Sequence, residues 1–253
     1  MTTHLHDTIV LFKRSLRHVL RSPDTIITTA VTPIAMLLLF VYVFGGAIDV
    51  GGANYVTYLL PGILLITVAS GIAYTAFRLF TDVSGGIVER FQSMPISRPA
   101  VLWSHVLTSL VANLVSLVLV IVVALAIGFR SGAGVLSWLA VLGVMTLFTL
   151  ALTWLALIPG LTARSVDGVS GFSYPLIFLP FISSAFVPTD GMPGPVRWFA
   201  EHQPVTPIVN TLRSLFTQQP VGQDGWLTVA WCLVLLAVAY VLATRIYARR
   251  LAQ

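Results

Sequence analysis

Six long apolar stretches constrain this chain more than any other feature. Of its 253 residues, 57% are hydrophobic and only 9% are charged. A soluble domain carries roughly 25% charged residues, so this chain cannot cover a surface that faces water. A helix needs about 20 apolar residues to cross a bilayer. The sequence therefore predicts an all-α membrane protein with six transmembrane helices, at about 25–44, 56–80, 100–128, 135–158, 166–187 and 226–245.

The basic residues predict how these helices are oriented. Six spans place both termini on one side of the membrane, and cytoplasmic loops carry an excess of Lys and Arg. With the termini inside, only Arg130, Arg197 and Arg213 lie outside, among 14 basic residues in all. We therefore expect a multi-pass protein of a prokaryotic plasma membrane with both termini cytoplasmic. The inside set is Lys13, Arg14, Arg17, Arg21, Arg78, Arg90, Arg98, Arg164, Arg245, Arg249 and Arg250.

Residues 1–24 form a separate region ahead of the transmembrane domain at 25–253. Apolar residues from Leu5 to Leu20 follow one helical face, with arginines beside it. This pattern is typical of a basic helix lying in an anionic membrane interface. A helix packed against the protein remains open, and the two interpretations are compatible. Cleavage as a signal anchor near residues 45–47 is disfavoured, because the apolar span is too long for a signal peptide.

The segment between the second and third spans carries acids and bases in mixed order. Gly85 and Gly86 end the preceding helix, and Pro95 and Pro99 close the segment. Between them, GIVERFQSM places its apolar residues on one side and its charged residues around the rest. This predicts a short amphipathic cytoplasmic helix that faces either a partner protein or the lipid surface.

The fifth span and the segment after it are rich in proline. Pro175 and Pro180 interrupt the span, and five further prolines fall between 188 and 207. Between these prolines lie two half-apolar pieces, VRWFA and PIVNTLRSLF. They predict either re-entrant helices, which need surrounding protein or a water-filled cavity, or two surface helices in an external loop. In both cases the segment caps the outer end of the bundle.

Polar residues within the spans form stripes, but no acidic residue lies deep in any span. Such stripes either pack helices together or line a route. The missing carboxylates argue against coupling to an ion gradient. His105 can titrate near neutrality or be a hydrogen-bonded residue at a helix end. The stripes are Thr67, Ser70, Tyr74 and Thr75; His105, Thr108, Ser109, Asn113 and Ser116; and Thr146, Thr149 and Thr153.

The sequence carries no enzyme motif. Lys13 is the only lysine, and no phosphate-binding G-x-x-x-x-G-K-[ST] loop occurs, so we expect no ATP site in this chain. Cys232 is the single cysteine, which excludes a disulfide framework and a thiolate metal site. No basic run is dense enough for nucleic acid. We expect no catalytic residue, cofactor or metal in this chain.

Three segments make the chain resemble an ABC type-2 transporter permease of the daunorubicin/doxorubicin-resistance kind. The cytoplasmic segment reads GGIVERFQSMPISRPAVLWSHVL, and the second span opens with YLLPGILLITVASG. The segment before the last span reads FVPTDGMPGPVRWFAEHQPVTPIVNTLRSLF. In this segment Gln203–Pro204 stands where many members have Asn-Pro. The resemblance covers nearly the whole chain.

The resemblance implies half of a transporter. Two permeases, identical or related, would pack with two separate ATPase subunits that bind ATP and magnesium. The helix between spans 2 and 3 would be a coupling helix seated in a groove of the ATPase. The cargo would be an amphiphilic drug, antibiotic, polyketide or lipid-like molecule moved outward. The expected coupling residues are Ile87, Glu89, Arg90, Phe91, Met94 and Arg98.

The same resemblance suggests a route and an extracellular gate. Polar and aromatic side chains of the spans are candidates for the route: Phe40, Phe44, Ser70, Tyr74, Phe77, Ser109, Asn113, Thr149, Thr153, Tyr174, Phe178 and Phe181. The external segment provides the gate candidates: Phe186, Pro188, Met192, Pro193, Trp198, Pro204 and Thr206.

Other functions remain open from the sequence. An exporter of polysaccharide, teichoic acid or glycolipid is the nearest alternative, although the apolar character of the chain favours hydrophobic cargo. A secondary carrier or channel, or a membrane scaffold, would work without an ATPase.

Overall fold

The structure is a computed structural model that describes residues 23–46, 54–86 and 98–250. The regular elements in this part of the chain are all helical. The long helices are α2 (Pro23–Leu39), extended by a π-helix at Phe40–Phe44, α3 (Tyr55–Ser84), α5 (Arg98–Ala126), α6 (Val135–Thr162) and α11 (Gly222–Arg250). The short ones are α7 (Val166–Gly171), α8 (Ser173–Phe178), α9 (Gly194–His202) and α10 (Val205–Thr217), with 3-10 turns at Leu179–Ile182 and Thr189–Gly191.

Four helices are long and apolar enough to cross a membrane. They are α3, α5 from Ala100, α6 and α11, and they correspond to the predicted spans 2, 3, 4 and 6. The predicted spans 1 and 5 correspond to shorter apolar helical segments at Thr29–Phe44 and Val166–Ile182. The structure thus describes an all-helical, multi-pass arrangement. The predicted helix at 1–24 lies outside the described residues, apart from its last two positions.

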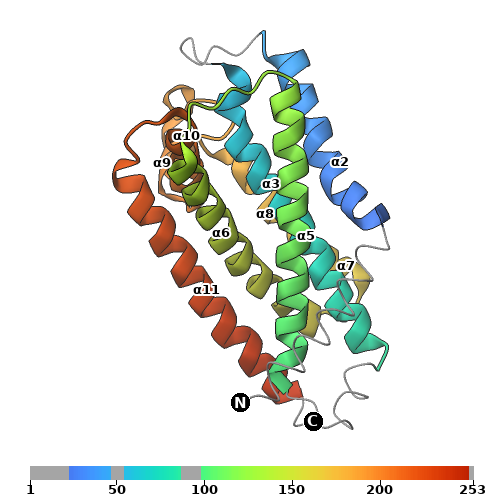
Figure 1. Cartoon of the computed structure of the whole chain (residues 1–253). Helices are drawn as coiled ribbons and strands as arrows, with labels where there is room; N and C mark the ends of the chain where they lie inside the picture. Colours follow the sequence, from blue (N-terminus) through green and yellow to red (C-terminus); the bar gives the residue numbers. More distant parts are fainter. Residues whose placement is uncertain (1–22, 47–53, 87–97, 251–253) are drawn as a thin grey trace.

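The long helices run between two ends of an elongated bundle (Figure 1). We call the end that holds Ser84, Arg98, Thr162 and Arg250 the lower end, as in Figure 1, and the other end the upper end. In the part of the chain that the structure describes, basic residues gather at the lower end, on Arg78, Arg164 and the last turns of α11. The upper end holds Arg130, Arg197 and Arg213.

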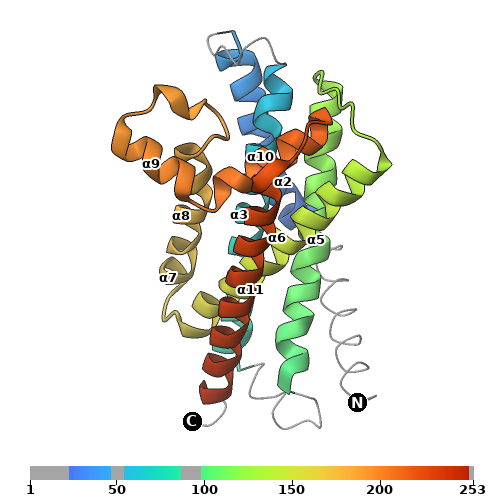
Figure 2. The ribbon, with the colours of Figure 1, turned by 90° about the vertical axis from the view of Figure 1, so that its left-hand side faces the viewer.

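Helix α3 is the centre of the bundle. Most of its residues are buried, whereas α11 buries only a few of its own. Figure 2 shows α7 and α8 on one flank of α3 and α5 on the other. Gly160 of α6 allows close packing here, because a Cβ at this position would lie 2.9 Å from the carbonyl oxygen of Ala76. A helix that is apolar all round and surrounded by others is typical of a bundle core.

Two apolar clusters hold the helices together. The larger one joins the upper parts of α3, α5 and α6 to α10, and includes Phe129, Phe148 and Phe216. The smaller one joins the lower ends of α3, α5, α6 and α11 around Trp154. Trp154 also meets Tyr240 of α11, with ring centroids 4.7 Å apart in a T-shaped pair. The lower ends of α3 and α5 therefore belong to one packed unit.

The proline-rich part folds as the sequence predicts in outline. The span over 166–187 is broken: α7 ends at Gly171, α8 at Phe178, and a 3-10 turn contains Pro180. The pieces VRWFA and PIVNTLRSLF lie within α9 and α10. The two helices differ in burial, because α9 is mostly exposed whereas α10 contributes Ile208, Leu212 and Phe216 to the core. Helix α10 is thus a part of the bundle and α9 is a surface helix.

Candidate functional site

The predicted coupling segment lies between two helices whose ends are fixed to each other. Helix α3 ends at Ser84, and Gly85 and Gly86 follow it, with Gly86 at φ 70°. Such a φ strongly favours glycine, which explains why the helix stops here. The coupling candidates Ile87, Glu89, Arg90, Phe91 and Met94 lie outside the described residues. Arg98 is the first residue of α5.

Asp82 and His105 link α3 to α5 beside this segment. The Nε2 atom of His105 lies 3.2 Å from Oδ2 of Asp82, and the histidine side chain is 5% exposed. Asp82 is partly exposed, at 34%. The interpretation of His105 as a partnered residue at a helix end therefore holds. Together with the shared apolar cluster, this contact joins the lower ends of α3 and α5.

Above this pair lies a polar pocket between α2, α3 and α5. Its lining follows one face of each helix, because the residues recur at spacings of three and four. The pocket has a volume of about 20 Å³. We call it the lower polar pocket; its lining is Thr29 of α2, Gly71, Tyr74, Thr75 and Arg78 of α3, and His105, Thr108, Ser109, Ala112, Asn113 and Ser116 of α5.

Hydrogen bonds connect this pocket to α6. Thr75 donates through Oγ1 to Oγ of Ser109 at 2.7 Å, and Ser109 lies 3.3 Å from Oγ1 of Thr153. Asn113 donates through Nδ2 to the carbonyl oxygen of Ser109 at 2.9 Å. The polar stripes on three spans thus meet at one place, and this hydrogen-bonded network ties α3, α5 and α6 together. The sequence predicted the stripes but not which of them meet.

Two atoms of this region lack partners within the described part of the chain. They are Oδ1 of Asn113 and Oγ1 of Thr149, both buried. The carboxamide of Asn113 packs against Gly71, where an added Cβ would lie 2.1 Å from Oδ1. Gly71 therefore makes room for Asn113, and an acceptor oxygen remains unused at the pocket wall.

Four of the aromatic route candidates, Phe40, Phe44, Phe178 and Phe181, gather around Phe186. Phe40 stacks on Phe186 with centroids 4.8 Å apart, and Phe181 stacks on Phe186 at 4.9 Å. The ring centroid of Phe44 lies 5.5 Å from that of Phe40, and the ring centroid of Phe178 lies 6.2 Å from that of Phe181. This aromatic cluster joins the π-helix after α2 to the segment after α8.

The route candidates therefore divide into separate groups. Tyr74, Ser109 and Asn113 line the lower polar pocket, and Thr153 joins its network. Ser70 is half-buried on α3 and Phe77 is exposed there, and neither lines the pocket. Tyr174 is exposed on α8. Within the part of the chain that the structure describes, the twelve route candidates do not form one continuous lining.

A half-buried arginine organises the upper end. The guanidinium of Arg213 on α10 stacks over the ring of Tyr58 on α3, 3.8 Å from its centroid. Its Nη2 donates to the carbonyl oxygens of Ser184 at 2.8 Å and of Tyr58 at 3.2 Å, and its Nη1 donates to Oδ1 of Asn210 at 3.2 Å. We call Arg213, Tyr58, Ser184 and Asn210 the upper arginine cluster. The cation is held by carbonyl oxygens and a π-face.

The motif around Gln203–Pro204 braces the same segment. Nε2 of Gln203 donates to the carbonyl oxygen of Ile182 at 2.6 Å. Oγ1 of Thr206 donates to the carbonyl oxygen of Ala200 at 2.5 Å and accepts from the amide of Ser184 at 3.5 Å. Gln203, Thr206, Asn210 and Arg213 are thus spaced so that their side chains hydrogen-bond to the irregular segment at 182–186, whose polar groups need such partners. Tyr58, Ser184 and Asn210 were not among the predicted site residues; the signal in the sequence was the Gln-Pro-x-Thr spacing from Gln203 to Thr206 with Arg213 after it.

The gate candidates occupy two different environments. Phe186 and Thr206 are buried, whereas Pro193 and Trp198 are exposed, Trp198 at 64%. Pro188, Met192 and Pro204 are half-buried. The sequence does not distinguish these environments, because proline and aromatic residues are common in both.

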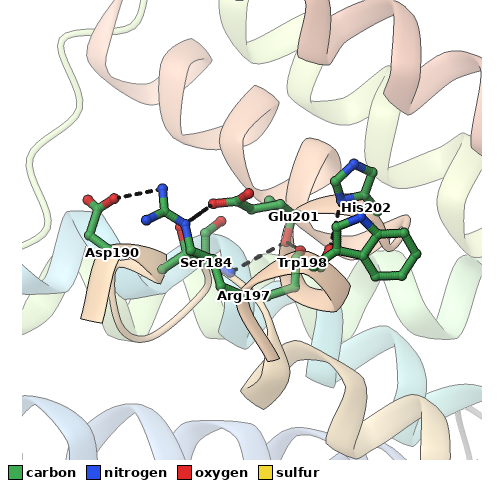
Figure 3. Close-up of polar contacts among 9 residues, drawn as sticks. Ser184, Asp190, Arg197, Trp198, Glu201 and His202 are labelled. Carbon is green, nitrogen blue, oxygen red and sulfur yellow. Dashed lines mark hydrogen bonds and ion pairs between the residues drawn. The ribbon is translucent and has the colours of Figure 1, made fainter. Parts of the chain in front are cut away.

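On the exposed side, charged residues and an aromatic pair cover α9 (Figure 3). Arg197 lies 2.7 Å from Oε1 of Glu201 and 3.2 Å from Oδ1 of Asp190, and Trp198 stacks on His202 at 4.8 Å between centroids. The hydrogen bond from Arg197 lowers the pKa of the Glu201 carboxyl, and the same contact raises the pKa of Arg197. The Arg197–Asp190 contact and the hydrogen bond from Thr189 to Glu201 hold α9 to the turn at Thr189–Gly191.

A second, apolar pocket of about 390 Å³ lies between α3, α5 and α6. Its walls are made of aliphatic side chains, Trp138 and Met145. Within the described residues, no group of three His, Cys, Asp or Glu is placed to hold a metal ion.

Long apolar helices with buried polar networks define a multi-pass membrane protein of the transporter class. The family model described as ABC-2 type transporter matches residues 6–217, and the chain belongs to this family.

Curated relatives extend the similarity over most of the chain. The daunorubicin resistance ABC transporter permease protein DrrB1 of Streptomyces coeruleorubidus is 29% identical over 249 residues, which cover 97% of this chain and 84% of the relative. The probable doxorubicin resistance ABC transporter permease protein DrrC of Mycobacterium tuberculosis is 24% identical over 241 residues, 92% of this chain and 87% of the relative. The putative transport permease ycf38 of Cyanophora paradoxa is 25% identical over 224 residues, 84% of this chain and 75% of the relative.

Proposed function

We propose that this chain is the permease subunit of an ATP-driven exporter of amphiphilic compounds. Family membership and the names of the relatives support this function. Two permeases, copies or related chains, would pair with two ATPase subunits, which carry the ATP and magnesium. The relatives named for anthracycline resistance favour a drug, antibiotic or lipid-like cargo over a polysaccharide.

In this proposal, the lower end of the bundle is cytoplasmic and the chain crosses the membrane six times. The bias of basic residues toward the lower end supports the orientation. The apolar segments Thr29–Phe44 and Val166–Ile182 would add two crossings to the four long helices. The bundle that buries α10 against α3 and α6 would then be closed from outside by the upper arginine cluster and the gate candidates.

In this proposal, the joined lower ends of α3 and α5 transmit the movement of the ATPase subunits to the membrane helices. ATP binding would close the two ATPase subunits and push on residues 87–97. Because Asp82 contacts His105 and both helices share an apolar cluster, the push would move α3 and α5 together. Motion of a packed unit transmits a displacement better than bending of a single helix. The network through Ser109 and Thr153 would pass it on to α6.

The test is transport by the assembled complex. Membrane vesicles turned inside out, holding the chain with its ATPase, should accumulate an amphiphilic drug only with ATP and magnesium. Phe91→Ala and Glu89→Ala should lower both drug uptake and drug-stimulated ATP turnover, because they remove contacts to the ATPase. Arg130→Ala, at the opposite end, is the matched control.

Two outcomes would contradict the proposal. Uptake driven by a proton or sodium gradient in vesicles that hold this chain alone would make it a secondary carrier. Normal ATP turnover and uptake in properly inserted Phe91→Ala and Glu89→Ala would remove the coupling role from residues 87–94.

A further inference from the structure

Helices α5 and α6 enclose an apolar groove in the upper half of the bundle. Lower down the two helices are in contact, because Oγ of Ser109 lies 3.3 Å from Oγ1 of Thr153. Above this contact they separate (Figure 1), and the pocket of about 390 Å³ lies between them and Leu64 of α3. We call it the upper apolar groove; its α5 residues lie between 114 and 122 and its α6 residues between 135 and 145.

The groove opens away from the centre of the bundle. Its inner wall is buried, since Leu64 is 0% exposed and Val141 is 3% exposed. Its rim is exposed in the described part of the chain, with Val118 and Leu139 both at 59%. Aliphatic side chains that are exposed on a membrane-crossing helix face the acyl chains of the bilayer. The groove is therefore a recess in the surface that meets lipid.

The walls of the groove exclude a polar occupant. They consist of leucine, valine, isoleucine and methionine side chains and one tryptophan. Only the indole N–H of Trp138 can donate a hydrogen bond, and none of these side chains is charged. A sugar or a charged group placed here would lose its hydrogen bonds to water without replacement, which is costly. The occupant must therefore be apolar along its length.

The groove has the length of one leaflet. Its α5 wall from Leu114 to Val122 extends about 12 Å, and its α6 wall from Val135 to Met145 about 15 Å, at about 1.5 Å per residue. The hydrocarbon core of a bilayer is about 30 Å thick, so each leaflet provides roughly 15 Å. The groove starts near the upper ends of both helices and ends near the middle of the bundle. This length fits one acyl chain of the leaflet at the upper end.

Aromatic contacts keep the upper end of the groove in shape. The ring centroid of Trp138 lies 5.4 Å from that of Phe216 on α10, and Phe129 meets Phe216 at 5.3 Å in a T-shaped pair. Ser131 donates through Oγ to the carbonyl oxygen of Phe216 at 3.0 Å. The connection between α5 and α6 is thus attached to α10. Closing the groove would break these contacts, and leaving it empty would leave its walls without packing partners.

We propose that the upper apolar groove binds one acyl chain of a membrane phospholipid as a resident lipid. The chain fills the space that the separation of α5 and α6 leaves, and its headgroup stays at the membrane surface of the upper end. The bilayer is as apolar as the groove, so close contacts with the walls retain the chain, and the hydrophobic effect does not. The inference goes beyond the proposed function, because neither ATP nor cargo takes part in this binding.

The test uses the full chain and two of its own tryptophans. Trp138 lies in the groove wall, whereas Trp231 is exposed on α11. The fluorescence of each is the difference between the parent chain and Trp138→Phe or Trp231→Phe. The chain is equilibrated in nanodiscs of phosphatidylcholine brominated on its acyl chains, because bromine quenches tryptophan at short range. It is then transferred through detergent into nanodiscs of unbrominated phosphatidylcholine.

Trp138 should keep most of its quenching after the transfer, whereas Trp231 should lose it. The reason is that the lipid around the chain is exchanged and the resident chain is not. Equal recovery of the two tryptophans would overturn the proposal. This comparison is made within the parent chain, so it does not depend on how any groove variant folds.

Filling the groove should release the resident chain. Ile121→Phe combined with Leu142→Phe adds two rings to the groove walls and should let Trp138 recover its fluorescence after the transfer. Val238→Phe combined with Val241→Phe, on the exposed face of α11, is the matched control and should keep Trp138 quenched. Quenching that persists in the filled groove would mean that the bromine lies elsewhere, and this would contradict the proposal.

Native mass spectrometry of the washed chain identifies the occupant. One bound mass equal to that of the supplied phosphatidylcholine supports the proposal, and a bound detergent or free fatty acid in its place counts against it. A second copy of this chain is tested with Leu139→Cys in a Cys232→Ser background, because Leu139 lies on the exposed rim. Efficient crosslinking of two chains through this cysteine would make the groove a protein interface and overturn the lipid site.

Discussion

The upper arginine cluster and the lower polar pocket each contain an arginine, but the two are built in opposite ways. Arg213 is held by carbonyl oxygens of Tyr58 and Ser184, by Asn210 and by an aromatic face. Arg78 lines a small cavity without such partners in the described structure. The first arrangement uses nearly every donor of its arginine, whereas in the second, among the described residues, Arg78 forms no hydrogen bond or ion pair and Oδ1 of Asn113 is buried without a partner.

The two arginines therefore lie in sites of different kinds: one holds elements together, and the other contains polar groups without partners among the described residues. A satisfied buried network fixes one arrangement of its elements and has little capacity for a ligand. A pocket with unused groups is less stable alone and gains free energy when a ligand supplies the missing partners. The upper cluster therefore fastens α3, α10 and residues 182–186 to one another.

The largest expected effect is loss of the fastening. Arg213→Ala should lower the free energy of unfolding by about 3 kcal/mol, because several carbonyl and amide oxygens lose charged hydrogen bonds. Unfolding by SDS, followed by intrinsic tryptophan fluorescence, measures the change. Arg130→Ala at the exposed surface is the control and should cost less than about 0.5 kcal/mol. If Arg213→Ala and Arg130→Ala lower the free energy of unfolding equally, Arg213 stabilises the fold no more than an arginine at the surface does.

The next effect tests the packing beside the lower pocket. Gly71→Ala should cost about 1–3 kcal/mol, because the new Cβ would overlap Oδ1 of Asn113. Adding Asn113→Ala should recover much of this loss in SDS unfolding, since the clashing group is gone. Gly143→Ala on α6, with no neighbour within 4 Å of the added atom, should be neutral or slightly stabilising. If the double variant is no more stable than Gly71→Ala, the clash is not the cause.

A smaller effect should follow from cutting the network between α5 and α6. Thr153→Val removes the hydroxyl that faces Ser109 and should cost about 0.6–1.5 kcal/mol, the usual range for such bonds in membranes. Thr244→Val on the exposed side of α11 removes a hydroxyl that bonds only within its own helix, and should cost less. Transport by Thr153→Val at full rate would mean that α6 needs no hydrogen-bonded link to α5.

The smallest effect concerns the exposed pairs on α9. Because the hydrogen bond from Arg197 lowers the pKa of Glu201, its contribution is present above the ordinary carboxyl pKa of about 4.3 and is lost as the pH falls through the lower folded value. Arg197→Gln should raise the pKa of Glu201, as a carboxyl NMR titration would measure. Asp190→Asn keeps the Arg197–Glu201 contact and removes a negative charge, so it should leave the pKa of Glu201 unchanged or lower it slightly. High salt should reduce the difference, since exposed pairs are screened.

Pattern and composition alone determined much of this protein. The apolar runs predicted membrane helices, four of which the structure confirms as long enough to cross. Gly85–Gly86 predicted the end of α3, and the prolines of 175–180 predicted the broken helix there. These features depend on neighbours in sequence: helix length, hydropathy and the geometry of glycine and proline act locally. The family followed from three local segments.

Only the tertiary structure decided which polar groups meet. The sequence showed stripes on three spans, and the fold joined Thr75, Ser109 and Thr153, while Oδ1 of Asn113 has no partner among the described residues. It also separated the phenylalanine cluster around Phe186 from the polar pocket, and it gave Arg213 its carbonyl partners on α3 and at Ser184. Periodicity gives the face of a helix but not its rotation against a neighbour. That rotation is set by close packing, such as Gly71 against Asn113 and Gly160 against Ala76.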